Sequence, residues 1–312
     1  MAQTSGVLTD AQRVERLSRP RRRPVRMVLD TDTYNEIDDQ FALTHTLLAS
    51  DRAGLEAVYA APFANERSSG PADGMARSRD EAEAIIGLGP APAVPVFEGA
   101  TEWLGVTGTP VPTAATADLI ERAGSLPADE LLYVVAIGAP TNVGTALALE
   151  PSLAERVVVV WLGGNARWWP TAREFNLQQD PVASRALLDS GVPLVLVPCG
   201  GVVDKLLTVR TEVEAFVRPA GKLGELLADR YAAFVPDRPG ASKVIWDLAA
   251  TAWALDPSWL TWSLTPSPRL TSDLTWSFDP ARHLIGEVTA VDRDAIFGDL
   301  FGRMAAWSSG AS

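Results

Sequence analysis

The 312-residue chain has few of the side chains that cross-link proteins or act as strong nucleophiles. Its single cysteine, Cys199, excludes an intramolecular disulfide and favours a reducing compartment. Of its two histidines, His45 falls in an apolar helical stretch and His283 precedes Leu-Ile, so we expect both to be structural. Because no histidine accompanies Cys199, we interpret this cysteine as a small buried residue and not as a nucleophile.

Long hydrophobic runs are also missing. No apolar stretch approaches the roughly 18 residues that a membrane span needs, and the N-terminal segment lacks the apolar centre of a signal peptide. We therefore expect a soluble protein of the cytoplasm that makes no membrane contact.

Positive charge is scarce, with 27 Lys and Arg against 39 Asp and Glu and a net charge of −12. An acidic surface repels a phosphate backbone, which argues against nucleic-acid binding and favours a small neutral or cationic ligand. Residues 1–24 are the exception, because they contain the basic, proline-broken run RVERLSRPRRRP. We expect a disordered, solvated tail there; contact with nucleic acid through Arg19 and residues 21–23 is the alternative.

From residue 25 onward, short apolar segments alternate with helical patterns. This alternation predicts an α/β fold with a mostly parallel central sheet and helices on both faces, a Rossmann-like doubly wound arrangement, in one domain over residues 25–312. Between the strands we expect helices that include 37–50, and a polar loop over 62–75; a later helix is expected over 243–255. The expected strands include 25–30, 55–61, 131–137 and 157–162.

Five acidic side chains gather where the first strand meets the first helix, in the stretch MVLDTDTYNEIDDQFA. They are Asp30, Asp32, Glu36, Asp38 and Asp39. So many carboxylates at one junction repel one another unless a cation or backbone donors neutralise them, which indicates a metal site. Calcium takes six to eight oxygen ligands, commonly including a main-chain carbonyl. Thr141, in the turn GAPTN after a strand, and Asp247 are further candidate ligands.

Two other metal or carboxylate motifs fit less well. A calcium EF-hand loop needs glycine at its sixth position, where counting from Asp30 gives Asn35, and it needs a preceding helix where this chain has a strand. A haloacid-dehalogenase phosphatase also begins with Asp-x-Asp after a strand, but it requires threonine four residues after the first aspartate, where this chain has Tyr34.

Taken together, the motifs resemble those of the inosine-uridine-preferring nucleoside hydrolases. The resemblance runs in family order from about residue 26 to residue 255. It includes Asn65 in the loop after the second strand, which is similar to a subgroup of the family. The matching pieces are Asp30-x-Asp32 with Asp38-Asp39, Gly138-Ala-Pro-Thr141-Asn142, Glu174-Phe-Asn176 with Asp180-Pro181, and Trp246-Asp247.

The resemblance implies one calcium ion held by Asp32, Asp39, the Thr141 main-chain carbonyl and Asp247. It also implies that Asp32 is the catalytic residue, the general base for the water that the metal activates. Asp38 and Asn65 are expected on the 2′ side of the ribose, and Glu174 and Asn176 on its 5′ side. Asp30 is expected to support the ligands from behind.

Two departures from the family pattern concern the pocket. Five residues separate Asp32 from Asp38, where the best-known members have three, and the insertion brings in Tyr34, Asn35 and Glu36. Many members also place a histidine before the late aspartate, where this chain has Trp246. Tryptophan stacks on a base but donates no catalytic proton. Trp168 is expected to add aromatic surface near the base; an oligomer contact through Trp168 and Trp169 is the alternative.

The resemblance implies calcium-dependent hydrolysis of the N-glycosidic bond of ribonucleosides, with release of base and ribose. The resemblance further implies a homodimer or homotetramer. Two alternatives stay open at this point: a haloacid-dehalogenase-type phosphatase, and a catalytically silent nucleoside- or sugar-binding protein that retains the metal site.

Overall fold

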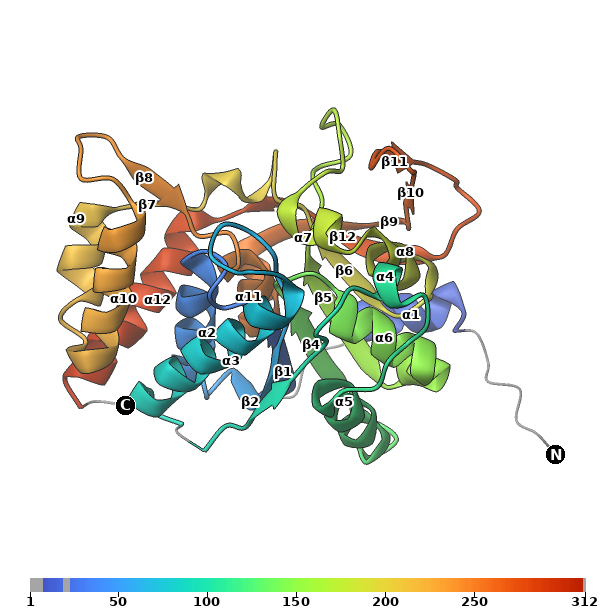
Figure 1. The fold of residues 1–312 in the computed structure, drawn as a ribbon, viewed down its shortest axis with the longest axis horizontal. Coiled ribbons are helices and arrows are strands. Elements are labelled where there is room, and N and C mark those ends of the chain that lie inside the picture. The colour runs from blue at the N-terminus through green and yellow to red at the C-terminus, as the bar shows by residue number, and fades with distance from the viewer. Residues whose placement is uncertain (1–7, 19–22, 92, 311–312) are drawn as a thin grey trace.

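The central element of the computed structural model, which describes residues 8–18, 23–91 and 93–310, is an eight-stranded sheet of order β3-β2-β1-β4-β5-β6-β12-β9 (Figure 1). All neighbouring strands pair in parallel except β9, which runs antiparallel to β12 at the edge. The strands are β1 (Val25–Thr31), β2 (Ala53–Ala60), β3 (Val96–Glu98), β4 (Leu132–Ala136), β5 (Val157–Leu162), β6 (Leu194–Val197), β9 (Leu260–Pro266) and β12 (Leu284–Val291).

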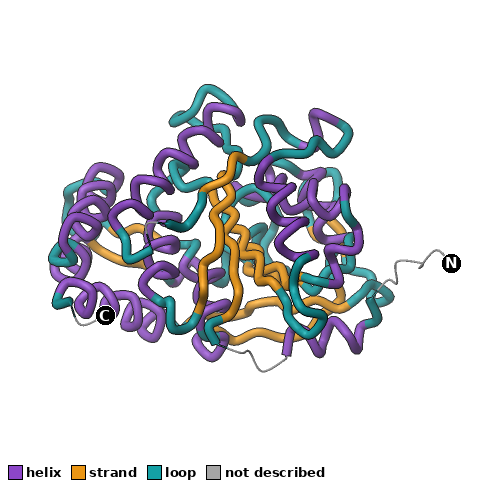
Figure 2. The backbone as a smooth tube through the Cα atoms, turned by 90° about the horizontal axis from the view of Figure 1, so that it is seen from below, coloured by secondary structure: helices purple, strands orange, loops and turns teal. Residues whose placement is uncertain are grey.

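Helices cover both faces of this sheet, and Figure 2 shows the strands running through the middle of the molecule between them. Two small antiparallel pairs lie outside it, β7 (Leu207–Val209) with β8 (Ser242–Val244) and β10 (Arg269–Leu270) with β11 (Trp276–Ser277). The helices are α1 (Asp10–Ser18), α2 (Asp38–Leu48), α3 (Pro71–Leu88), α4 (Leu104–Thr107), α5 (Ala114–Gly124), α6 (Thr141–Leu149), α7 (Phe175–Gln179), α8 (Pro181–Asp189), α9 (Arg210–Glu212), α10 (Gly221–Phe234), α11 (Leu248–Leu255) and α12 (Arg293–Ser308).

The parallel strands are apolar on both faces because each face packs against its own helical layer. In β1, Met27 and Leu29 join the core under α2, α3, α10, α11 and α12, whereas Val28 joins the core under α5, α6 and α8. This two-sided burial explains why the strands appear in the sequence as continuous apolar runs. The predicted doubly wound α/β fold is confirmed.

The N-terminal segment differs from the disordered tail that we predicted, because residues 10–18 form α1. Arg13 and Leu17, four residues apart, face the same way and are both buried. The Arg13 Nε donates to the Gly191 carbonyl at 2.7 Å, and the Asp10 carboxylate accepts the Leu284 amide at 2.9 Å. Residues 1–7, and the arginines at 19, 21 and 22, lie outside the described residues.

Two other element predictions are wrong in part. Residues 243–255 are not one helix, because Lys243 belongs to β8 and α11 begins only after Asp247, its N-cap residue. The polar loop that we expected to continue to residue 75 ends earlier, because Pro71 occupies the first turn of α3, where a proline needs no hydrogen-bond donor. Among the described helices, none is long and apolar enough to cross a membrane.

Candidate active site

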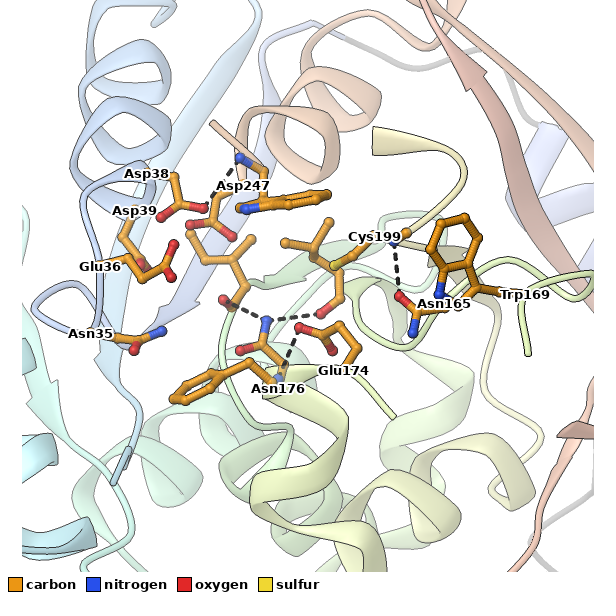
Figure 3. Close-up of a pocket in the computed structure, with 15 residues that line it drawn as sticks. Asn35, Glu36, Asp38, Asp39, Asn165, Trp169, Glu174, Asn176, Cys199 and Asp247 are labelled. Atoms are coloured by element: carbon orange, nitrogen blue, oxygen red, sulfur yellow. Dashed lines mark hydrogen bonds between the residues drawn. The ribbon is translucent and has the colours of Figure 1, made fainter. Parts of the chain in front are cut away.

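A cavity of about 260 Å³ opens at the carboxyl ends of the parallel strands, the edge of an α/β sheet where ligands usually bind (Figure 3). Residues directly after β1, β4, β5 and β6 line it. The polar lining comprises Asn35, Glu36, Asp38, Asp39, Asn165, Glu174, Asn176 and Asp247, and the remaining lining includes Ile137, Leu162, Trp169, Phe175, Cys199, Gly200 and Trp246.

Three aspartates from two distant segments meet at one wall of this cavity. Asp38 and Asp39 lie in the first turn of α2, and Asp247 occupies the N-cap position of α11. All three are buried, and each offers a carboxylate oxygen within 4.8 Å of the other two. The main-chain amide of Trp246 donates to Asp38 Oδ2 at 3.2 Å and joins the two segments.

Asp32 lies beneath this group and is fully buried, and neither of its carboxylate oxygens accepts a hydrogen bond from a donor of the described residues. Asp247 Oδ2 likewise has no donor. Buried carboxylate oxygens without donors are costly, so a cation is the partner that would satisfy them. Oxygen-only donors fit a hard divalent cation and not a soft one.

The electrostatics of the cluster lead to the same conclusion. Burial raises the pKa of Asp32, and the charges of Asp39 and Asp38 raise it further. Burial and the neighbouring Asp38 raise the pKa of Asp39 to about 7. The pKa of Asp247 rises for the same two reasons, burial first and then Asp38 and Asp39. The cluster therefore resists full ionisation unless positive charge is supplied.

The GAPTN turn packs against this cluster. A Cβ at Gly138 would lie 3.2 Å from the Cγ of Asp32, so glycine permits this close approach. Thr141 is buried at the start of α6, and its hydroxyl donates to Asp180 Oδ2 at 3.0 Å. Its role as a main-chain ligand stays a prediction. Burial raises the pKa of Asp30, behind the site, to about 7.

Glu174 and Asn176 form the opposite wall, across the cavity from Asp38 and Asp39 (Figure 3). Glu174 is the N-cap of α7, and its carboxylate accepts the amides of Asn176, Leu177 and Gly164 at 3.0, 3.2 and 2.9 Å. Burial raises its pKa although these three donors lower it. The Asn176 Nδ2 donates to the carbonyls closing β4 and β5, Ile137 and Leu162, both at 3.1 Å. The Asn176 amide oxygen is thereby left as its ligand-facing group.

Two residues predicted to contact substrate lie outside the cavity lining. The Asn65 Nδ2 instead donates to the carbonyl and side-chain oxygens of Asn35, at 3.3 and 2.7 Å, so Asn65 supports a wall residue from behind. Trp168 is 71% exposed, and its neighbour Trp169 lines the cavity in its place. Strand and loop periodicity do not determine which of two adjacent loop side chains turns inward.

Several lining residues are not among those that the sequence patterns predict. Asn165 follows β5 in the motif GGN, and a polar residue just after a strand is the same signal that indicated Asp32. Its side-chain oxygen accepts the Gly200 amide at 2.9 Å, and its side-chain nitrogen donates to the carbonyls of Thr171 and Arg173. These bonds hold the loop together. Cys199 is buried, as expected, and burial followed by the charge of Glu174 raises the pKa of its thiol. Neither histidine lines the cavity.

Comparisons with known proteins find ribonucleoside hydrolases that are similar to this chain. Over 140 residues the chain is 28% identical to the pyrimidine-specific ribonucleoside hydrolase RihA of Klebsiella pneumoniae, covering 42% of this chain and 45% of that protein. It is 28% identical to Escherichia coli RihB over 102 residues, 31% of this chain and 32% of the relative. The matched part of the chain thus spans less than half the length of these relatives.

Solved structures share the fold across nearly the whole chain. A plant nucleoside hydrolase, PpNRh1, superposes with a TM-score of 0.72 at 22% identity, covering 91% of this chain and 99% of that one. A purine-preferring ribonucleoside hydrolase from Gardnerella vaginalis gives a TM-score of 0.68 at 19% identity, covering 92% and 100%. The profile of the inosine-uridine preferring nucleoside hydrolases matches residues 27–294, from within β1 into α12, and the chain therefore belongs to that family.

Proposed function

We propose that this protein hydrolyses the N-glycosidic bond of ribonucleosides, releasing base and ribose, with calcium as its cofactor. The observation that carries the proposal is the set of buried carboxylate oxygens without donors, both oxygens of Asp32 and Oδ2 of Asp247, next to Asp39; Asp39 and Asp247 line the cavity and Asp32 lies behind them. The family assignment supports the reaction class and leaves the haloacid-dehalogenase alternative without support.

The proposed calcium ligands are Asp32, Asp39, Asp247 and the main-chain carbonyl of Thr141. When bound, the cation supplies positive charge that lowers the pKa of a nearby water and attracts ribose hydroxyls. A carboxylate oxygen of Asp38 lies within 4.8 Å of carboxylate oxygens of Asp39 and Asp247. Asp38 therefore lies next to two of the proposed calcium ligands, where we propose that it holds the 2′ side of the ribose.

In this mechanism Asp32, which is buried next to Asp39 and has no hydrogen-bond donor on either carboxylate oxygen, accepts the proton of the water that attacks C1′. The departing base leaves positive charge on the sugar ring. The carboxylates of Asp38 and Glu174, on opposite walls of the cavity, stabilise that charge. Glu174 and Asn176 orient the 5′ side of the ribose.

The leaving base is proposed to stack on Trp246, which lines the cavity directly before Asp247. Neither histidine reaches the lining, so the described site offers no imidazole acid to protonate the base. We therefore expect activated ribosides with good leaving groups to react faster than inosine.

The test is metal analysis together with hydrolysis of inosine, uridine and p-nitrophenyl riboside by the wild-type protein, Asp32→Ala and Asp247→Ala. We expect stoichiometric calcium and base release by the wild type, and loss of both in the variants. Purified protein without divalent metal, and variants with full activity, would overturn the proposal. Ribose binding by calorimetry without base release over hours would indicate the catalytically silent binding protein instead.

A cytoplasmic location and a homodimeric or homotetrameric assembly, which we expect from the sequence, complete the proposal. Light scattering after size-exclusion chromatography tests the assembly. A mass equal to one chain of 33.3 kDa would contradict it.

A further inference from the structure

The inserted residues 34–36 bring an amide side chain into the wall of the cavity. Asn35 lines the cavity together with Asp38 and Asp39, and it is only 8% exposed. Its main-chain amide donates to the Asp32 carbonyl at 2.7 Å, which fixes the residue to the loop that carries the acidic cluster. The hydrolytic roles above give Asn35 no task, although a buried amide at a substrate cavity has hydrogen bonds to offer.

A chain of hydrogen bonds behind the wall sets which way the Asn35 amide faces. The Arg67 main-chain amide donates to the Asn65 Oδ1 at 2.8 Å, so Nδ2 is the Asn65 atom that turns toward Asn35. That nitrogen donates to the Asn35 Oδ1 at 2.7 Å and to the Asn35 carbonyl at 3.3 Å. Because a main-chain N–H only donates, each link has one direction, and the Asn35 Nδ2 is the atom left for the cavity. Figure 3 shows this nitrogen pointing toward the cavity.

The other two amide side chains of the lining have already used their donors. The Asn165 Nδ2 donates to the carbonyls of Thr171 and Arg173, and the Asn176 Nδ2 donates to two strand-end carbonyls. The Asn35 Nδ2, in contrast, donates to no group of the residues that the structure describes. The ionised carboxylates of the lining only accept. Asn35 therefore supplies a free N–H donor within a wall of acceptors.

A sugar hydroxyl is the ligand group that such a wall fits. A hydroxyl has one O–H to donate and lone pairs that accept. Carboxylates alone take the proton and leave the lone pairs without a donor. On this wall, Asp38 uses Oδ2 to accept the Trp246 amide, and its Oδ1 accepts nothing from the described part of the chain. The wall of Asp38 and Asn35 thus offers an acceptor for a hydroxyl proton and a donor for a hydroxyl oxygen.

We propose that Asn35 is a substrate-binding residue that donates from its Nδ2 to the 2′-hydroxyl oxygen of the ribose, and that Asn65 is a positioning residue that acts through it. The inference rests on the proposed function, in which Asp38 on the same wall holds the 2′ side. It goes beyond that function because it gives the contact expected of Asn65 to a residue of the insertion.

Asn65→Asp tests this chain of hydrogen bonds without changing the cavity lining, to which residue 65 does not belong. Aspartate still accepts the Arg67 amide but has no N–H for Asn35. The Asn35 amide then turns its nitrogen toward residue 65 and its oxygen toward the cavity, so the donor for the sugar is lost. Asn65→Asp should therefore reproduce the effect of Asn35→Ala, which removes that donor directly.

The experiment measures how inosine or uridine, whichever binds more tightly, inhibits hydrolysis of p-nitrophenyl riboside, together with its 2′-deoxy and 3′-deoxy forms. The wild type should bind the 2′-deoxy form at least about 5-fold more weakly than the parent nucleoside. Asn35→Ala and Asn65→Asp should raise the inhibition constants of the parent and the 3′-deoxy form roughly 5-fold to 100-fold. The constant of the 2′-deoxy form should change by less than about 2-fold, because it lacks the group that Asn35 binds.

Gln12→Glu is the matched control. It makes the same change from amide to carboxylate at an exposed position of α1, where the side-chain oxygen accepts from Thr9, and it should keep all three inhibition constants. A melting curve of each variant confirms that it folds.

The outcomes separate the two proposals. Wild type that binds the parent and its 2′-deoxy form equally overturns the role of Asn35, even if a variant does not fold. A rise that is equal for all three ligands, or one that spares the 3′-deoxy form, also overturns it. Asn65→Asp with wild-type constants overturns the positioning role. Wild type that cleaves no riboside, or that neither nucleoside inhibits, overturns the proposed function and this inference with it.

Discussion

The main-chain amide of Trp246 donates to Asp38 Oδ2 at 3.2 Å and ties the start of α11 to the acidic loop, 208 residues earlier in the chain. Through this bond, Asp38 combines a structural contact with its proposed role at the ribose. The two tasks can be separated, because the hydrogen bond needs only an acceptor oxygen whereas the role at the sugar needs a charge.

Asp38→Asn keeps an acceptor oxygen for the Trp246 amide and removes the negative charge. We expect kcat/KM for uridine to fall roughly 100-fold to 1000-fold, since electrostatic stabilisation at the sugar is lost. The melting temperature should change by no more than about 2 °C. Steady-state kinetics and a thermal melt measure both. Asp294→Asn, at a position 91% exposed, is the control, and equal kinetics for the two variants would contradict the assignment.

Asp32→Asn should raise the stability of the metal-free protein and lower its activity. It removes one charge from a crowded, buried group, so the metal-free protein should melt at a higher temperature than metal-free wild type. Activity should fall by at least about 1000-fold, because the proton acceptor is gone. Thermal melts of metal-free samples measure the change in stability, and base-release assays measure the change in activity. A lower melting temperature together with full activity would refute both parts.

Calcium should stabilise the protein more at about pH 8 than at about pH 5.5. In the metal-free protein, burial and Asp38 raise the pKa of Asp39 to about 7, above its unfolded value. Such an acid binds its proton more tightly when folded, so its stabilisation is present at low pH and is lost as pH rises toward 7. Calcium and protons compete for the same carboxylate oxygens, so calcium binds more tightly at the pH at which the carboxylates are ionised.

The measurement is the rise in melting temperature when calcium is added to metal-free protein at the two pH values. Sodium chloride at equal ionic strength controls for general screening. A rise that is equal at both pH values, or larger at the lower one, would show that the acids of the cluster do not govern binding.

Trp246→Ala should raise KM for inosine roughly 5-fold to 150-fold, because stacking of a base on an aromatic ring is worth ~1–3 kcal/mol. Trp168→Ala is the matched control, since that ring is 71% exposed and lies outside the cavity lining. It should leave KM within about 2-fold of wild type. An equal rise in both variants would restore Trp168 as a substrate contact.

Asp180→Asn should destabilise the fold by about 1–3 kcal/mol. The fully buried carboxylate accepts the amides of Leu104, Gly105 and Ala183 and the hydroxyl of Thr141. The side-chain amide of asparagine would place its own N–H group opposite at least one of these four donors, and that donor would lose its hydrogen bond. Urea denaturation measures the loss, with Asp273→Asn on the surface as the control. Unchanged stability would mean that the segment around α4 rearranges freely.

The sequence by itself determined the doubly wound sheet and most of the carboxylates of the site. Buried parallel strands require continuous apolar runs, and polar groups that follow such strands are carried to one edge of the sheet, so both features are local in the chain. Asp32, Asp38 and Asp39 were identifiable for this reason. The motif order then added Glu174, Asn176 and Asp247.

Only the tertiary structure decided which side chains turn into the cavity and what the insertion does. Trp169 and not Trp168 lines it, Asn65 supports Asn35 from behind, and Glu36 pairs with Lys243 across 207 residues. Such choices depend on contacts between segments that fold together from distant parts of the chain. A sequence periodicity, which describes one element at a time, does not contain them.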